Sequence, residues 1–204
     1  MTPRITLVLA AFALVGVSNP AAEPARSCCA QDANGVATAA QPSNRSIYQI
    51  EATWTDDAGG PARLNSLQGR PVVLAMFFTN CVSACPVIVS NMLRVQEALP
   101  GKLRAKARFV LVSFDSERDT PAELRLYRER MGLGADWELL HGRPDDVREL
   151  AMVLGVKYAK DNRGQFAHSN LITVLNPEGE IAFQLAGLKS DISAVARAVV
   201  AADK

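Results

Sequence analysis

The chain has 204 residues, of which 49% are hydrophobic, and its 22 basic and 21 acidic side chains leave a formal net charge of +1. This length suits one globular domain with some surplus, because a domain typically takes about 100–200 residues. The near-zero charge argues against nucleic acid as a partner, since phosphate binding requires a clear basic excess. The apolar content excludes disorder throughout the chain, and four cysteines are too few for a disulfide-dense scaffold.

The first 22 residues have the features of an export signal. Positive charge near Arg4 is followed by an uncharged apolar run over residues 5–17. This run is shorter than the roughly 20 residues that a spanning helix needs, and the small residues after it suit a cleavage site. We predict a cleaved signal peptide over residues 1–22, with a retained membrane anchor as the alternative. Both predict an exported protein, periplasmic or tethered to the cytoplasmic membrane.

Residues 23–45 are rich in Ala, Pro, Gln, Asn and Ser and are poor in the large apolar side chains that build a core. We predict a flexible tether here. Cys28 and Cys29 lie within it. We interpret them as accessory thiols, with an extra metal or redox site as the alternative. The folded domain is predicted over residues 46–204.

Six segments of this domain have strand patterns, because they are apolar or alternate with period two. They are residues 47–53, 72–78, 107–114, 137–140, 171–175 and 180–185. The second and third are continuous apolar runs, which is typical of strands buried on both faces. The last two flank the turn at residues 176–179 and predict an antiparallel hairpin.

Four helices are predicted between and after these strands. Proline at a first helical position or a capping residue marks their starts, at Pro86, Thr120-Pro121, Pro144 and Asp191. The first helix is expected to end at Pro100-Gly101. The alternation predicts an α/β fold of thioredoxin-like architecture, with a central parallel-rich sheet, flanking helices and a C-terminal antiparallel hairpin.

Cys81 and Cys85 lie between the first buried strand and the first helix. Ligands bind beyond the carboxyl ends of the strands in such sheets, and a helix N-terminus stabilises thiolate over thiol. Two sulfurs at this spacing can converge on one ion or form a redox-active disulfide. A purely stabilising disulfide is the weaker alternative, because a bridge closing so small a loop constrains the unfolded chain little.

His168 is one of only two histidines and immediately precedes the predicted hairpin. In thioredoxin-like folds this loop faces the cysteine turn. Two thiolates and one imidazole suit Cu(I), and can hold Cu(II) if a further ligand joins. Structural zinc sites usually take four ligands. The chain has no proline between Pro144 and Pro177, so it lacks the cis-proline that thioredoxin-type oxidoreductases keep opposite their cysteines. We therefore predict a metal site formed by Cys81, Cys85 and His168.

Other candidate ligands have simpler interpretations. His141 ends a short predicted strand and is expected to serve the turn that follows. Met76 lies on a buried strand and Met92 on the inward face of the first helix, so core packing explains both. We find no convincing acid–base carboxylate pair, Gly-rich phosphate loop or hydrolase elbow in the sequence.

The sequence resembles the Sco/SenC family of copper chaperones over about residues 46–203. The resemblance rests on three features in order: Cys81-x-x-x-Cys85-Pro86 after an apolar strand, Phe114-Asp115-Ser116-Glu117-Arg118-Asp119-Thr120-Pro121, and His168-Ser169 before the hairpin. It implies an exported domain that binds copper, as Cu(I) or Cu(II), through the two cysteines and the histidine. It also makes Asp115 a candidate for orienting the site, whereas Asp119 and Thr120 are expected to cap the next helix.

The resemblance further implies a role in assembling the dinuclear copper centre of cytochrome c oxidase. The expected partners are the apo form of cytochrome c oxidase subunit II and a copper donor protein. Another exported copper enzyme, such as nitrous-oxide or nitrite reductase, is the alternative target. The main alternative function is a thiol–disulfide reductant that keeps the target's copper-ligand cysteines reduced. A peroxidase is disfavoured, because Thr79 stands two residues before Cys81 and the expected Thr-x-x-Cys spacing is missing.

Three positions depart from the family pattern. Val82 replaces the proline that commonly follows the first cysteine, and Ser116 replaces the proline after the acidic residue. Ala167 stands where the family commonly has Asp before the histidine. This last change removes a candidate hydrogen-bond partner of His168, and such partners orient metal ligands.

Overall fold

The computed structural model describes residues 43–162, 164–188 and 191–203. The predicted signal peptide and nearly all of the predicted tether, with Cys28 and Cys29, lie outside the described residues. Among the helices in the described part of the chain, none has the length and apolarity to cross a membrane.

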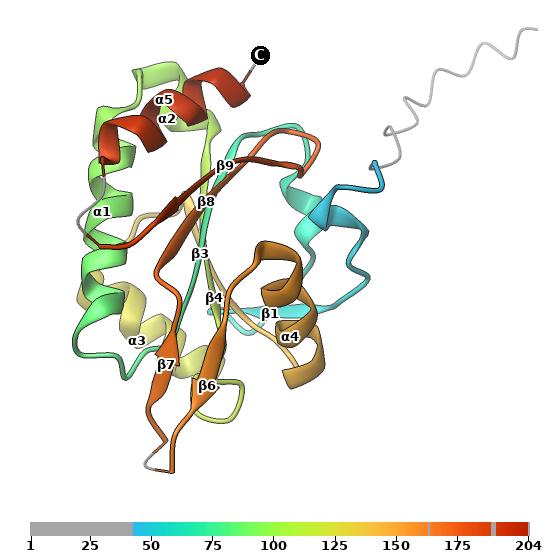
Figure 1. Ribbon diagram of the computed structural model, residues 1–204, viewed down its shortest axis with the longest axis vertical. Coiled ribbons are helices and arrows are strands. Elements are labelled where there is room, and N and C mark those ends of the chain that lie inside the picture. The colour runs from blue at the N-terminus through green and yellow to red at the C-terminus, as the bar shows by residue number, and fades with distance from the viewer. Residues whose placement is uncertain (1–42, 163, 189–190, 204) are drawn as a thin grey trace, which may run out of the picture. The chain divides into compact units, whose positions relative to one another are not determined.

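A seven-stranded sheet forms the centre of the domain (Figure 1). Its strands are β1 (Trp54–Asp56), β2 (Pro61–Ala62), β3 (Val72–Phe77), β4 (Arg108–Ser113), β5 (Trp137–His141), β8 (Leu171–Leu175) and β9 (Ile181–Ala186). They run in the order β2-β1-β5-β4-β3-β8-β9. The three central strands β5, β4 and β3 pair in parallel, whereas β1 and the β8–β9 hairpin add to this centre antiparallel.

Helices cover both faces of the sheet. They are α1 (Ala84–Ala98), α2 (Gly101–Lys106), α3 (Pro121–Met131), α4 (Pro144–Leu154) and α5 (Ile192–Ala202), with short 3-10 turns η1 (Ile47–Gln49) and η2 (Leu64–Leu67). Figure 1 shows α1, α3 and α5 on one side of the sheet and α4 on the other. The predicted thioredoxin-like fold is confirmed, with parallel pairing confined to the three central strands.

The core lies on both faces of the central strands. All six residues of β3 and five of the six in β4 are buried, which explains their continuous apolar sequences. Each fully buried Val, Leu or Phe contributes roughly 1.5–3 kcal/mol relative to an exposed one. Met76 and Met92 are buried in this core, as predicted. The carboxyl ends of β3 and β4 are thereby held at fixed positions.

The predicted helix starts agree closely with the structure. Thr120 is the N-cap of α3, and its hydroxyl accepts the Glu123 N–H at 3.3 Å. Gly155 ends α4 in the left-handed conformation, at φ +70°. Helix α1 begins at Ala84, two residues earlier than expected. Pro86 is tolerated there because the first N–H groups of a helix have no intrahelical acceptor.

The predicted edge strand over residues 47–53 is wrong. Residues Ile47–Gln49 form the 3-10 turn η1, and strand β1, which lies between β2 and β5, begins only at Trp54. The Ser46 hydroxyl accepts the Tyr48 N–H at 3.1 Å, and the Ile47 N–H bonds to the Gly179 carbonyl at 3.0 Å. The first of these bonds is a local side-chain bond of the kind that competes with strand pairing, and the second holds the turn to a distant segment.

A second, two-stranded sheet was not predicted. Strand β6 (Tyr158–Lys160) pairs antiparallel with β7 (Phe166–His168) as a hairpin. His168 therefore ends a strand instead of lying in a loop, opposite Tyr158. Helix α2 was also not predicted. Pro100-Gly101 is typical of a helix end, but a second, short helix begins directly at Gly101.

Candidate metal centre

Cys81 and Cys85 lie where the carboxyl end of β3 turns into α1. Cys85 is completely buried in the first turn of α1, and Cys81 is 8% exposed. The Cys85 N–H donates to the Cys81 sulfur at 3.3 Å. Ser83 occupies the N-cap position without a side-chain capping bond, so the Cys81 sulfur accepts one of the free N–H groups at the helix start.

His168 faces this turn from the end of β7. Its Nε2 lies 3.8 Å from the Cys85 sulfur, and the ligand atoms of Cys81, Cys85 and His168 all lie within 4.8 Å of one another. The structure therefore brings together the three residues that the sequence singles out.

The imidazole is oriented by a backbone carbonyl. His168 Nδ1 lies 3.1 Å from the Ser169 carbonyl oxygen. Since a carbonyl can only accept, Nδ1 donates its proton to it, and Nε2 is directed at the cysteines. The ring also packs against Phe78 and Phe114, with centroids 6.1 and 5.1 Å away. The Ser169 carbonyl thus orients the imidazole. The side chain of Ala167 cannot do so, because it has no hydrogen-bond acceptor.

The donor spacing fits a three-coordinate metal ion. With metal–ligand bonds of about 2.0–2.3 Å, a planar three-coordinate ion needs donors about 3.5–4.0 Å apart. The distance between Cys85 Sγ and His168 Nε2 is within this range, and no pair of donors exceeds 4.8 Å. Small side-chain movements therefore suffice to surround an ion, and the two-sulfur, one-nitrogen set suits a soft metal.

The pKa values of the two thiols are shifted in opposite directions. Burial alone would raise the pKa of Cys81, but the N–H groups of Cys85 and Ser83 and the side chains of Cys85 and His168 lower it from 9.0 to about 7. Burial raises the pKa of Cys85 far above its ordinary value, and the adjacent Cys81 sulfur adds to this effect. The metal-free site therefore pairs Cys81, which is about half thiolate at pH 7, with the buried thiol of Cys85.

The site opens into a hollow of about 320 Å³. Its walls include Phe78, Ser83 and Asn170 besides Cys81 and His168, and no Asp, Glu, Lys or Arg lines it. Val82, between the two cysteines, is 94% exposed at its rim. The hollow therefore gives an incoming protein loop access to the sulfur of Cys81.

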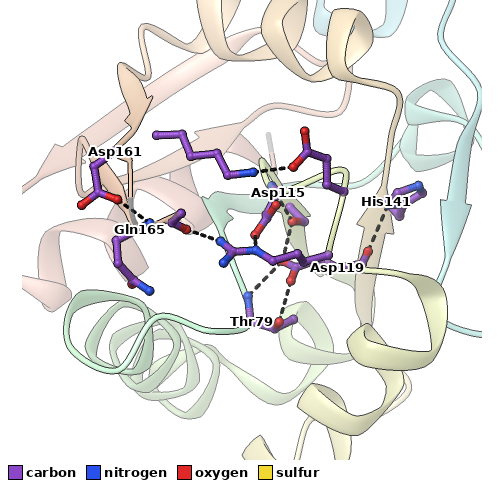
Figure 2. A network of polar contacts seen from close by, with 11 residues as sticks. Thr79, Asp115, Asp119, His141, Asp161 and Gln165 are labelled. Atoms are coloured by element: carbon purple, nitrogen blue, oxygen red, sulfur yellow. Dashed lines mark hydrogen bonds and ion pairs between the residues drawn. The ribbon is translucent and has the colours of Figure 1, made fainter.

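A buried carboxylate supports the cysteine turn from below. Asp119 is completely buried and accepts hydrogen bonds from the Thr79 N–H at 2.9 Å, the Thr79 hydroxyl at 2.5 Å and the Ser113 hydroxyl at 2.6 Å (Figure 2). The expectation that Asp119 caps α3 is wrong, because it points inward and Thr120 alone caps the helix. Asp119 and Thr79 are supporting residues that sequence reasoning missed.

Asp115 lies outside the cluster of potential ligands. It is 1% exposed, and its Oδ2 accepts the Arg118 Nε–H at 2.5 Å. Its other carboxylate oxygen is buried without a hydrogen-bond partner. Asp115 therefore contacts Arg118 and not the three donors, so any orienting role must pass through Arg118.

His141 has a structural role, but it supports a different segment from the following turn that the sequence predicted. Its Nδ1 lies 3.0 Å from the Asp119 carbonyl oxygen, so it supports the same segment that carries the buried carboxylate. It is absent from the group of potential ligands around Cys81 and Cys85.

Known proteins match this chain over its folded part. Residues 40–202 match the SCO1/SenC family model. The chain belongs to the SCO1/SenC family. A Stutzerimonas stutzeri protein described as copper-binding is 30% identical over 144 residues, which cover 69% of this chain and 69% of that protein.

Solved structures of SCO1/SenC proteins share the fold. ScoI of Bradyrhizobium japonicum, solved with copper bound, is 25% identical with a TM-score of 0.59, covering 74% of this chain and 96% of that chain. BsSco, a Sco-family cytochrome c oxidase assembly protein with a disulfide switch, is 25% identical with a TM-score of 0.64, covering 79% of this chain and 95% of that chain. The resemblance seen in the sequence is thus confirmed at the level of the SCO1/SenC family.

Proposed function

We propose that this protein binds one copper ion through Cys81, Cys85 and His168 and delivers it to an apo copper enzyme. The observation that carries the proposal is the convergence of these three donors within 4.8 Å at one end of the sheet. Two sulfurs and one imidazole form a set suited to Cu(I), which a further ligand extends to Cu(II). The copper bound to the related ScoI supports this choice of metal.

We propose cytochrome c oxidase subunit II as the target, with its dinuclear copper centre as the destination. The description of BsSco as a cytochrome c oxidase assembly protein supports this proposal. Nitrous-oxide reductase and nitrite reductase are the alternative targets, and a separate donor protein supplies the copper. The apolar run near the N-terminus supports an exported protein, periplasmic or membrane-tethered.

The open hollow suggests how copper leaves the site. Thiolates of the target approach past Val82 and replace the ligands of the ion one at a time, so that the metal is never released to water. No oxidation or reduction is needed for this exchange. Because no Asp, Glu, Lys or Arg lines the hollow, its recognition of the target rests on shape, apolar contact and hydrogen bonds to polar side chains such as Ser83 and Asn170.

Anaerobic copper titration of the reduced domain tests this proposal. We expect about one copper per chain, tight binding that is lost in Cys81→Ser and Cys85→Ser, and binding weakened by about 10-fold or more in His168→Ala. The matched control is His141→Ala, which removes the other histidine without touching the donors. Copper affinity unchanged by His168→Ala, or lowered equally by His141→Ala, contradicts the assigned ligand set.

A second function is favoured by the unequal thiols. In a reductant, the Cys81 thiolate attacks a target disulfide and forms a mixed disulfide. Cys85 then gives up its proton and displaces the target thiol, so the target gains two thiols while Cys81 and Cys85 become a disulfide. The low pKa of Cys81 suits the attacking role. The disulfide switch of BsSco supports this candidate.

Stoichiometric reduction of a disulfide-bonded peptide carrying the target's two copper-ligand cysteines separates the two functions. A reductant transfers two electrons per domain without copper, and His168→Ala keeps this activity. A copper carrier without reductant function leaves the peptide oxidised in the absence of the metal.

A further inference from the structure

His168 is carried by a hairpin that is not part of the main sheet. Strands β6 and β7 pair only with each other in the described residues, whereas Cys85 is completely buried in the core. One donor thus depends on the attachment of a small, separate element. The geometry of the site depends on whatever fixes this hairpin to the body.

Arg118 makes that attachment at the tip of the hairpin. Its Nη2 donates to the Gly164 carbonyl, and its guanidinium carbon lies 6.0 Å from the centre of the Phe166 ring. On the other side, its Nε donates to Asp115 at 2.5 Å. The buried carboxylate therefore anchors the arginine, and the arginine holds the hairpin.

Hydrogen bonds connect the tip of the hairpin to the strand that carries His168. The Asp161 carboxylate accepts the Gln165 N–H at 2.8 Å near the tip (Figure 2), and the Gly164 N–H bonds to the Asp161 carbonyl at 3.0 Å. Beyond the tip, the two strands pair in register up to His168. A constraint on the Gly164 carbonyl thus limits the position of the imidazole four residues away.

The segment that carries Arg118 also supports the cysteines. Asp119, the next residue, binds the backbone and hydroxyl of Thr79, two residues before Cys81. Figure 2 shows Asp115, Asp119 and Thr79 within one polar network. Residues 115–119 therefore connect the cysteine half of the site with the histidine half.

Other contacts hold the hairpin less specifically. The ion pair between Lys160 and Glu117 is exposed, with side-chain exposures of 35% and 76%, and such pairs contribute little. Phe114 stacks on Tyr158 with a centroid distance of 5.2 Å. This contact holds the hairpin against the body, but stacked rings can shift parallel to each other without losing contact. The Arg118 guanidinium instead donates hydrogen bonds to two acceptors, and such directional bonds fix the orientation of the hairpin as well as its contact with the body.

We propose that Arg118 is a positioning residue of the metal site, which holds the β6–β7 hairpin so that His168 Nε2 faces the Cys85 sulfur. This inference rests on the proposed copper binding. It assigns Arg118 no contact with the ion, and its effect must pass through His168.

The test compares Arg118→Gln in two backgrounds by the rate at which a strong chelator removes Cu(I). With His168 present, we expect Arg118→Gln to speed copper loss by about 10-fold, the usual lower limit for losing a group that orients a ligand. In the His168→Ala background we expect a change below about two-fold, because the imidazole that Arg118 positions is absent. Arg197→Gln, which breaks an exposed ion pair on α5, is the matched control and should change neither rate.

Three outcomes overturn the inference: an equal acceleration in both backgrounds, no acceleration in either, or the same effect from Arg197→Gln. If Arg118→Gln fails to fold, Arg118→Lys replaces it. Lysine keeps the charge beside Asp115 but lacks the fork that reaches Gly164 as well, so faster copper loss is again expected only with His168 present. Absence of copper binding in the unsubstituted protein overturns the proposed function instead, so the two failures are distinguishable.

Discussion

Cys81 and Cys85 are chemically different although they share one turn. Cys81 accepts an N–H at the start of α1 and borders the open hollow. Cys85 is buried beneath it with a strongly raised pKa. The spacing of the two residues predicted a reactive pair, but only the structure shows which of the two cysteines borders the hollow.

The reactivity of Cys81 in the metal-free, reduced protein should follow its lowered pKa. Below this pKa the thiol is protonated and reacts slowly, and above it the thiolate dominates. We expect the alkylation rate of Cys81 to rise with pH with a midpoint of about 7, while Cys85 remains slow. Mass spectrometry of the separate peptides distinguishes both sites from Cys28 and Cys29. A Cys81 midpoint near the ordinary 9.0 would contradict the hydrogen-bonded arrangement.

Asp119 illustrates what sequence reasoning missed. An aspartate next to a helix start is usually predicted to cap the helix, and Asp119 before Thr120-Pro121 fits that pattern. The buried role depends on Thr79 and Ser113, which lie on other segments and meet Asp119 only after the strands have paired. A side chain's partner in a distant segment cannot be read from local pattern.

Replacing Asp119 with alanine should destabilise the domain. The change leaves the Thr79 N–H and two hydroxyls buried without their acceptor, at a cost of about 3 kcal/mol. Urea unfolding of the reduced, metal-free protein measures the difference. Asp145→Ala removes an exposed carboxylate paired with Arg148 and should cost less than about 1 kcal/mol. An equal loss of unfolding free energy from both substitutions would mean that the hydrogen bonds of Asp119 contribute no special stability.

The β6–β7 hairpin shows why short elements escape prediction. Each strand has only three residues, and their period-two pattern is too short to separate from a loop. Long elements such as β3 and α1 were predicted because their patterns continue over several residues. The site was predicted because its cysteines flank a strong strand and helix, and His168 precedes a strong hairpin.

The hairpin should be less protected than the central sheet. Within the described residues its strands pair with no other strand, and they are half-buried or exposed, so its hydrogen bonds open without disturbing the core. We expect its amides to exchange with deuterium much faster than those of β3 and β4 in the metal-free protein. Copper bound to His168 should slow exchange in β7. Exchange as slow as that of β3 without metal would rule out a separately attached hairpin.

The complete domain combines a rigid thioredoxin-like body with one lightly attached donor. The order of strands and helices could be predicted because alternation of the two patterns leaves few possible topologies. The conformation of residues 47–53 could not, because Ser46 and Gly179 fix it by hydrogen bonds, and the edge strand predicted there does not form. The predicted signal and tether remain predictions.

Copper should stabilise the domain, because it binds the folded arrangement of donors from two separate segments, the cysteine turn and β7. At a free concentration 100 times the dissociation constant, the gain is about 2.7 kcal/mol by mass action. Thermal unfolding with and without Cu(I) measures it, and the rise in Tm should be smaller in His168→Ala at the same copper concentration. A rise of the same size in Cys81→Ser/Cys85→Ser would show that the metal acts elsewhere.

X-ray absorption spectroscopy of the copper-loaded protein tests the proposed ligand set most directly. Under anaerobic conditions we expect a copper ion with two sulfur neighbours and one imidazole nitrogen. In His168→Ala the imidazole signal should disappear while both sulfurs remain, and His141→Ala should leave the spectrum unchanged. A copper ion without sulfur neighbours, or an imidazole signal that survives His168→Ala, would contradict the proposed centre.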